Sequence, residues 1–141
     1  MKNLVLTDGT LTIRYLSDTF AGAMHDKRMA EADPYCLPLG SWLLQDLGFL
    51  GFSLDGVETL TPFKTPKGGA LTLLQKAFNR QLASLRVQIE HVISSVKRCR
   101  IAKDICRLRL PGALDAVMEI ACSLHNFRLA LFPWQPLIKS E

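Results

Sequence analysis

The chain has 141 residues, of which 48 % are hydrophobic, and a formal net charge of +4; these values suit one globular domain and exclude a disordered or fibrous protein. Its most apolar tract, residues 110–132, is interrupted by Asp115 and Glu119, so it is not the run of roughly 18 apolar residues that a membrane span needs. Met1-Lys2-Asn3 lacks a signal-peptide pattern. We therefore expect a soluble, cytoplasmic protein, with a domain over residues 1–132 and a tail over 133–141.

The four cysteines, Cys36, Cys99, Cys106 and Cys122, form no Cys-x-x-Cys pair and no regular framework. This pattern predicts reduced structural thiols. Cys122 and His125 are three residues apart on a predicted helix, but their spacing from the other cysteines is poor for a zinc site.

Charge is unevenly distributed along the chain. Residues 1–58 carry four cations against eight acids, whereas residues 59–110 carry eleven cations against Glu90 and Asp104. A solvated face is one interpretation, but so basic a segment is more typical of a surface that binds a polyanion, with nucleic acid as the leading candidate. Aromatic residues are not interleaved with the cations, which favours contact with duplex phosphates over stacking on single-stranded bases.

The first predicted element is a β-hairpin. Residues 3–7 and 10–17 are rich in β-forming residues and flank Asp8-Gly9, a dipeptide that suits a two-residue hairpin turn. We therefore interpret Asp8 as a turn residue.

A short helix is predicted from about Met24 to Ala32, where nearby prolines close it. His25 and Asp26 lie in its first turn. An aspartate there satisfies free N–H groups and the helix dipole, and no partner in the sequence supports a functional role for His25.

A short apolar segment, residues 41–45, is typical of a buried strand, and Asp46 stands where it ends. Carboxylates at strand ends border the crevice in which open α/β sheets bind ligands, although a turn residue is the plainer interpretation of Asp46. Residues 57–63 predict a further strand. The loop after it carries Lys64 and Lys67, which could meet phosphate.

A long helix is predicted from the capping box Thr72-x-x-Gln75 to about Arg98. Glu90 lies in its C-terminal half, where an ion pair with Arg86 is the plain interpretation and a metal ligand beside a DNA-binding surface is the alternative. The apolar positions at helical spacing predict one inward stripe of Phe78, Leu82, Leu85, Ile89, Val92 and Val96.

A basic, irregular link over residues 99–112 separates this helix from a last amphipathic helix, Ala113 to about Leu131. Two polar residues, His125 and Asn126, lie near the end of this helix, and we expect hydrogen bonds to satisfy them. The residues expected to face inward are Leu114, Val117, Met118, Ala121, Leu124 and Phe127.

Four motifs in this order carry a resemblance that covers nearly the whole chain: LSDTFAGAMHDKRMAEAD, LLQDLGFLGF, KAFNRQLASLRVQIEHVISSVKRCRIAKD and AVMEIACSLHNFRLALF. Together they resemble the C-terminal part of a DDE transposase of the bacterial insertion-sequence type, related to Harbinger-like transposases. The resemblance implies an α/β, RNase H-like fold. It also implies DNA transposition by an enzyme that cuts and joins DNA with two divalent ions, Mg²⁺ or Mn²⁺, held by Asp, Asp and Glu.

By this resemblance Asp46 matches the second aspartate of the triad and Glu90 matches the glutamate, so both are predicted catalytic and metal-binding residues. The stretch from His25 to Lys27 matches a family signature that supplies none of the triad. Asp8 cannot replace the first aspartate, because in the family that residue precedes the hairpin.

The resemblance therefore implies that residues 1–132 form a partial DDE domain, truncated so that the central first strand and its aspartate are missing. Two acids hold two hard cations poorly, and we expect little or no strand cleavage by this polypeptide alone. We expect a product encoded upstream to supply the missing strand, which would otherwise leave two hydrogen-bonding edges exposed.

Transposon-end duplex DNA is the expected partner, and the protein would be nucleoid-associated when bound to it. A non-catalytic DNA-binding protein derived from a transposase, either a regulator or a relic, is the alternative, and a helical interaction domain is a third possibility. The predicted phosphate contacts are Lys64, Lys67, Arg80, Arg86, Lys97, Arg98, Arg100 and Lys103.

Overall fold

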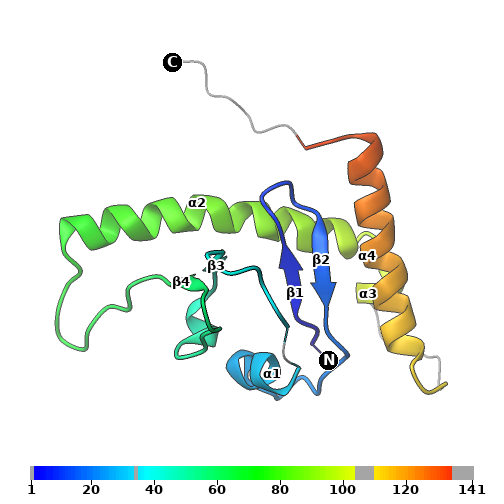
Figure 1. Ribbon diagram of the computed structural model, residues 1–141, viewed down its shortest axis with the longest axis horizontal. Helices are drawn as coiled ribbons and strands as arrows, with labels where there is room; N and C mark the ends of the chain where they lie inside the picture. The colour runs from blue at the N-terminus through cyan, green and yellow to red at the C-terminus, as the bar shows by residue number, and fades with distance from the viewer. Residues whose placement is uncertain (1, 34, 104–109, 135–141) are drawn as a thin grey trace. The chain divides into compact units, whose positions relative to one another are not determined.

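The computed structural model describes residues 2–33, 35–103 and 110–134, except for the side chain of Lys103 (Figure 1). The chain divides into two compact units. The first unit comprises Met1–Leu4 and Phe20–Val87, and the second comprises Val5–Thr19 and Gln88–Glu141. Each unit contains helix and strand, so the chain is a mixed α/β protein, as predicted.

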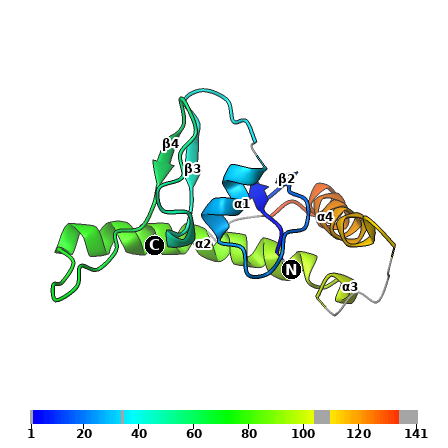
Figure 2. The same cartoon turned by 90° about the horizontal axis from the view of Figure 1, so that it is seen from below.

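The first unit contains a parallel pair of short strands, β3 (Trp42–Leu44) and β4 (Glu58–Leu60). The two strands lie side by side in Figure 2, with Leu43 opposite Thr59. Both strands fall inside the segments predicted for them. Because the strands are parallel, their carboxyl ends lie at the same edge of the pair, and Asp46 follows that end of β3.

Helix α1 (Asp26–Ala32) begins two residues later than predicted and has His25 as its N-cap. It buries Met29 and Ala30. A 3₁₀ turn, η1 (Leu47–Phe49), follows Asp46 directly. The buried apolar residues of this unit are Leu4, Met29, Ala30, Tyr35, Leu43, Phe52 and Leu82.

Helix α2 (Leu73–Val96) starts at the predicted capping box. The backbone N–H of Gln75 donates to Thr72 Oγ1 at 3.2 Å, and the backbone N–H of Thr72 donates to Gln75 Oε1 at 3.0 Å. This reciprocal pair satisfies two donors at the helix start. Leu85, which we predicted on the inward stripe, is 45 % exposed, so that part of the prediction is wrong.

The second unit contains the hairpin of β1 (Val5–Thr7) and β2 (Ile13–Leu16), which pair antiparallel as expected. The turn is longer than the predicted two residues. Leu11 N–H donates to the Asp8 carbonyl, Asp8 N–H donates to the Thr12 carbonyl, and the register shifts after Leu6. Leu11 completes the turn at φ +66°, a conformation that a leucine adopts only when its surroundings hold it there.

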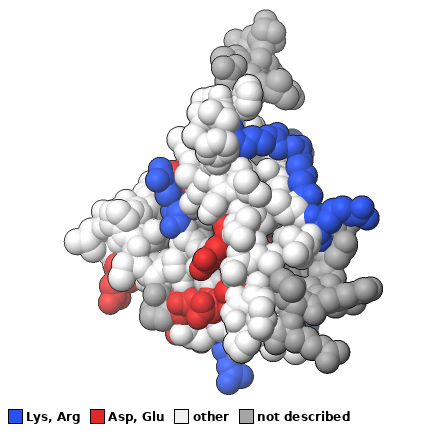
Figure 3. All heavy atoms as spheres, turned by 90° about the vertical axis from the view of Figure 1, so that its right-hand side faces the viewer, with Lys and Arg blue, Asp and Glu red and all other residues white. Residues whose placement is uncertain are grey.

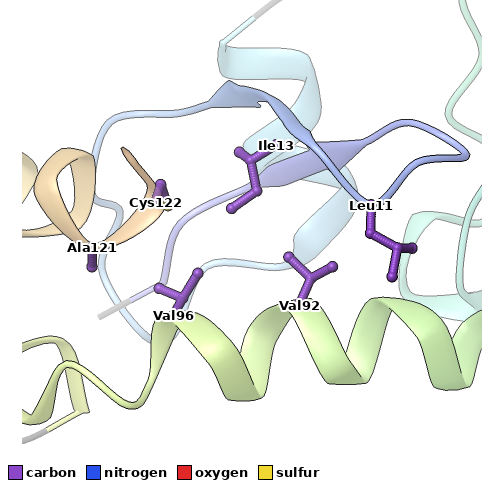
Figure 4. Packing of buried hydrophobic residues seen from close by; sticks show 6 residues of the cluster. All are labelled: Leu11, Ile13, Val92, Val96, Ala121 and Cys122. Atoms are coloured by element: carbon purple, nitrogen blue, oxygen red, sulfur yellow. The ribbon is translucent and has the colours of Figure 1, made fainter. Parts of the chain in front are cut away.

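Those surroundings are the core of the second unit (Figure 4). Leu11 and Ile13 point toward Val92 and Val96 of α2, and Leu11 is only 4 % exposed. Burying four aliphatic side chains against one another offsets the backbone strain at Leu11. The buried cluster consists of Leu11, Ile13, Val92, Val96, Ala121 and Cys122.

Helix α4 (Ala113–Leu131) has the predicted bounds but a different inward face. Val117 and Ala121 are buried as predicted, whereas Leu124 and Phe127 are 52 % and 64 % exposed, so these two predictions are wrong. The buried face contains Cys122 and His125 instead. A helix that carries apolar residues all round does not reveal from its sequence which face packs.

Polar contacts select the face of α4 that packs. His125 Nε2 lies 3.0 Å from the Leu11 carbonyl oxygen. The Asn126 side chain accepts from Ile13 N–H at 2.8 Å and donates to the Ile13 carbonyl at 2.9 Å. The prediction that these two polar residues are satisfied by hydrogen bonds is confirmed.

In its described part the basic link contains a short helix, α3 (Arg100–Lys103), where we predicted irregular chain. Cys36, Cys99 and Cys122 are free thiols; Cys106 lies outside the described residues. No helix in the described part of the chain is both long and apolar enough to cross a membrane.

Candidate active site

Asp46 lies at the carboxyl end of β3, in extended conformation, and its side chain caps η1. Its Oδ1 accepts a hydrogen bond from the backbone N–H of Leu47 at 2.8 Å. The backbone N–H of the preceding residue, Gln45, donates to the Leu60 carbonyl, which continues the parallel pairing one residue beyond β3. The carboxylate is therefore fixed on a regular strand end, the position predicted from the sequence, and is exposed to solvent.

The Arg86 guanidinium is the cationic partner of Asp46. Arg86 Nη1 lies 3.2 Å from Asp46 Oδ1, and the two side chains are 55 % and 46 % exposed. Both hydrogen bonds to the Asp46 carboxylate from described residues reach Oδ1, so Oδ2 accepts none from that part of the chain. The Asp46 carboxylate thus has one oxygen with two hydrogen bonds and one oxygen with none from the described residues.

The sequence did not reveal this pair. Arg86 was predicted as a phosphate contact or as the ion-pair partner of Glu90, four residues along the helix. Its contact with Asp46 joins residues forty positions apart, and neither charge patterning nor helical spacing could have found it. It depends on how α2 packs within the first unit.

Glu90 is an exposed residue of α2 and belongs to the second unit, whereas Asp46 belongs to the first. Both are carboxylates, and oxygen ligands of this kind are those that Mg²⁺ and Mn²⁺ prefer. Taken separately, each carboxylate has the chemistry and the exposure that a ligand of a divalent cation needs. Among the described residues, no group of three or more His, Cys, Asp or Glu side chains is placed to hold a metal ion.

The predicted phosphate contacts are surface residues. Lys64, Lys67, Arg80 and Arg86 are exposed in the first unit, and Lys97, Arg98 and Arg100 are exposed in the second. Only Arg86 of these seven forms an ion pair with a described acid. The face shown in Figure 3 carries both lysine or arginine and aspartate or glutamate side chains. The side chain of Lys103, the eighth predicted contact, lies outside the described residues.

Asp8 is a turn residue, as predicted. Its Oδ1 accepts from the backbone N–H groups of Thr10 and Thr12 at 2.9 and 3.1 Å, and its Oδ2 accepts from Arg14 Nε at 2.6 Å. Desolvation alone would raise the pKa of Asp8, but these bonds and one from the Thr10 hydroxyl outweigh it and lower that pKa from 3.8 to about 2.

The sequence is similar to known proteins over most of its length. The sequence pattern of a family described as DDE superfamily endonuclease matches residues 1–126. The chain is 29 % identical over 110 residues to a probable transposase for insertion sequence element IS702 of Microchaete diplosiphon. That match covers 78 % of this chain and 40 % of the relative, so the chain corresponds to less than half of the relative's length. No solved structure matches the chain.

Proposed function

Because this chain belongs to the DDE superfamily endonucleases, we propose that it is the Asp–Glu part of a transposase that cuts and joins double-stranded transposon-end DNA. Asp46 and Glu90 are the acids of this part. The observation that carries the proposal is the position of Asp46, an exposed carboxylate at the carboxyl end of a parallel strand, inside the segment that matches the family.

In this proposal Asp46 and Glu90 hold divalent cations, Mg²⁺ or Mn²⁺. Asp46 offers Oδ2, which no described residue occupies, while the Leu47 amide fixes the orientation of the carboxylate through Oδ1. When bound, the two ions of the complete enzyme activate the attacking hydroxyl group and stabilise the leaving oxygen. Arg86, beside Asp46, supplies positive charge for the phosphate of the scissile strand.

We place the first aspartate of the triad on a strand outside these 141 residues, supplied by a longer form of the chain or by a separate polypeptide. The pairing within each unit supports this placement. Among the described residues, β1 pairs only with β2 and β3 pairs only with β4, so each pair has two outer edges at which a further strand could pair. In the RNase H-like fold that the family implies, the strand that carries the first aspartate is the central one.

Metal binding tests the role of the two acids. We expect Mn²⁺ to bind the purified chain weakly, and Asp46→Asn and Glu90→Gln each to weaken that binding by about tenfold or more, since a metal ligand is lost. Glu119→Gln, which changes an exposed acid of α4, is the matched control. Paramagnetic broadening of backbone amides by Mn²⁺ measures the affinity and the place of binding, and unchanged affinity in both variants would refute the assignment.

Complementation tests the missing strand. The chain alone is expected to show little or no metal-dependent nicking of transposon-end DNA. Co-expression with the polypeptide encoded immediately upstream should yield a soluble complex that binds metal and cleaves these ends. The same complex with the upstream aspartate changed to asparagine should assemble without cleaving. Nicking by the chain alone would contradict the proposal, and failure of the two pieces to associate would contradict the supply of the missing strand by a separate polypeptide.

The second candidate is a non-catalytic DNA-binding protein derived from a transposase. The six exposed cations that pair with no described acid favour it, because they need no catalytic carboxylate to bind phosphate. Salt-dependent DNA binding that is unchanged by Glu90→Gln and by magnesium would select this function over the enzyme.

A further inference from the structure

The turn that follows Asp46 packs closely against the start of α1. A β-carbon added at Gly48 would lie 2.6 Å from Asp26 Oδ2, and one added at Gly51 would lie 3.2 Å from Lys27 Nζ. At 2.6 Å even an alanine at position 48 would force the Asp26 carboxylate or the turn to move. Gly48 thus lets the turn lie directly on the Asp26 side chain.

The Asp26 carboxylate is itself held in place. Its Oδ1 lies 3.1 Å from Lys2 Nζ, and Lys2 Nζ also donates to the Met24 carbonyl at 3.3 Å. The backbone of Lys2 pairs with Phe20 through two hydrogen bonds of 3.0 and 2.8 Å. The Lys2 backbone is therefore held by Phe20, and the partly exposed Lys2 ammonium group pairs with the carboxylate that faces Gly48.

The far end of the same turn is fixed from the other side. The Gln45 side chain is buried and donates to the Phe52 carbonyl at 3.0 Å, which ties residue 52 back to the end of β3. Between these two restraints Asp46 Oδ1 accepts the Leu47 N–H. The direction of the Asp46 side chain depends on the path of this turn, because the amide that orients it belongs to the turn.

We propose that Asp26 is a positioning residue for Asp46: its carboxylate, anchored by Lys2, supports the turn at Gly48 and so keeps the Leu47 amide in place to orient the Asp46 side chain. The helix signature from His25 to Lys27, which supplies no member of the triad, gains a role through this contact. The functional consequence rests on the proposed role of Asp46 as a metal ligand, whereas the structural link between Asp26 and Asp46 does not.

A double-mutant cycle tests the structural link. The amide chemical shift of Leu47 reports its hydrogen bond to Asp46, and the Asp46→Ala protein gives the value without that bond. Gly48→Ala in the otherwise unchanged protein should move the Leu47 shift toward that value. In the Asp26→Ala background, where the close contact is gone, Gly48→Ala should have little further effect. Equal effects in both backgrounds, or none in either, would overturn the proposal.

Three further variants separate positioning from general damage to the fold. Asp26→Asn keeps the size of the side chain and an oxygen for Lys2, so it should retain the Leu47 shift of the unchanged protein. Arg28→Gln removes an exposed charge from the same helix, and Gly9→Ala adds a methyl group where no atom lies within 4 Å. Neither control should move the Leu47 amide; movement in either would contradict a specific contact.

Metal affinity provides the second readout. Broadening of the Leu47 amide by Mn²⁺ should need about tenfold more metal in Asp26→Ala than in Asp26→Asn, as for other residues that orient a ligand. If Mn²⁺ fails to broaden this amide in the unchanged protein, the proposed metal site is wrong, while the chemical-shift cycle still decides whether Asp26 positions Asp46. The double-mutant cycle could show the expected coupling between Asp26 and Gly48 while Mn²⁺ affinity is equal in Asp26→Ala and Asp26→Asn. That result would refute the role of Asp26 in metal binding.

Discussion

Single residues in this chain take their roles from the neighbours that the fold gives them, and Asp8 shows this most directly. Four hydrogen bonds from Thr10, Thr12 and Arg14 reach its carboxylate within one hairpin turn. They stabilise the ionised form, which is why the pKa falls to about 2 although desolvation opposes the change. The residue that most resembles a spare catalytic acid is thus engaged in holding the hairpin turn.

The lowered pKa of Asp8 predicts how stability depends on pH. Because the pKa is lower in the folded than in the unfolded state, the stabilisation is present above pH 4 and is lost as the pH falls from about 4 to about 2. Asp8→Ala should lower the free energy of unfolding at pH 7 by about 1–2 kcal/mol, measured by urea denaturation. The variant should also lose part of the acid dependence. Asp18→Asn, an exposed acid of the same unit, is the control.

The ion pair between Arg86 and Asp46 predicts that removing Arg86 changes stability little but changes metal binding. Its ion pair with Asp46 is half exposed, so Arg86→Gln should change the free energy of unfolding by no more than about 1 kcal/mol. Without the competing guanidinium, Mn²⁺ should bind Asp46 more tightly in the absence of DNA. Arg80→Gln, an exposed cation of α2 without an ion pair to a described acid, should leave metal affinity unchanged. Weaker Mn²⁺ binding in Arg86→Gln would show that the arginine supports the site instead.

At the scale of elements, predictions were confirmed where they rested on contacts between residues close together in the sequence. The Thr72–Gln75 capping box predicts the start of α2 because both hydrogen bonds join residues three apart. Thr72→Ala should lower the free energy of unfolding by about 1 kcal/mol, measured by urea denaturation. Thr65→Ala, an exposed loop threonine nearby, should change it by less than about 0.5 kcal/mol. Equal effects would mean that the box contributes no stability.

Helix α4 shows the limit of such signals. Its bounds follow from Gly112 before it and from its apolar composition, but its buried face does not. Ile120, Leu124, Phe127 and Leu131 form an apolar stripe that is more than half exposed, while the neighbouring face, with Val117, Ala121, Cys122 and His125, packs. The hydrogen bonds of His125 and Asn126 to the hairpin decide the orientation, and those contacts span more than a hundred residues.

For the whole molecule, the charge asymmetry of the sequence becomes a set of exposed cations in both units. If they contact duplex phosphates, the logarithm of DNA affinity should fall linearly with the logarithm of salt concentration. Lys97→Gln should weaken binding to all sequences alike and lower the slope by about one. Arg28→Gln, an exposed cation outside the basic segment, is the matched control, and an equal loss in this variant would point to net charge alone.

The sequence by itself determined the family, the order of most elements and the identity of the two candidate acids. These follow from short-range information: residue order within motifs, helical spacing, capping and turn chemistry. The turn of the hairpin was mispredicted because Leu11 adopts a positive φ. Burial of its side chain in the core offsets the strain of this conformation. Leu85, Leu124 and Phe127 were mispredicted because periodicity locates an apolar stripe without saying what covers it.

Only the tertiary structure decided which side chains surround Asp46. Arg86 reaches it from forty residues away, and Asp26 supports its turn through Gly48 from twenty-two residues away. Such contacts depend on packing between elements, which leaves no periodic trace in the sequence. Motif order predicts Asp46 as a candidate ligand; the folded unit determines the cation that pairs with the carboxylate and the turn that orients it.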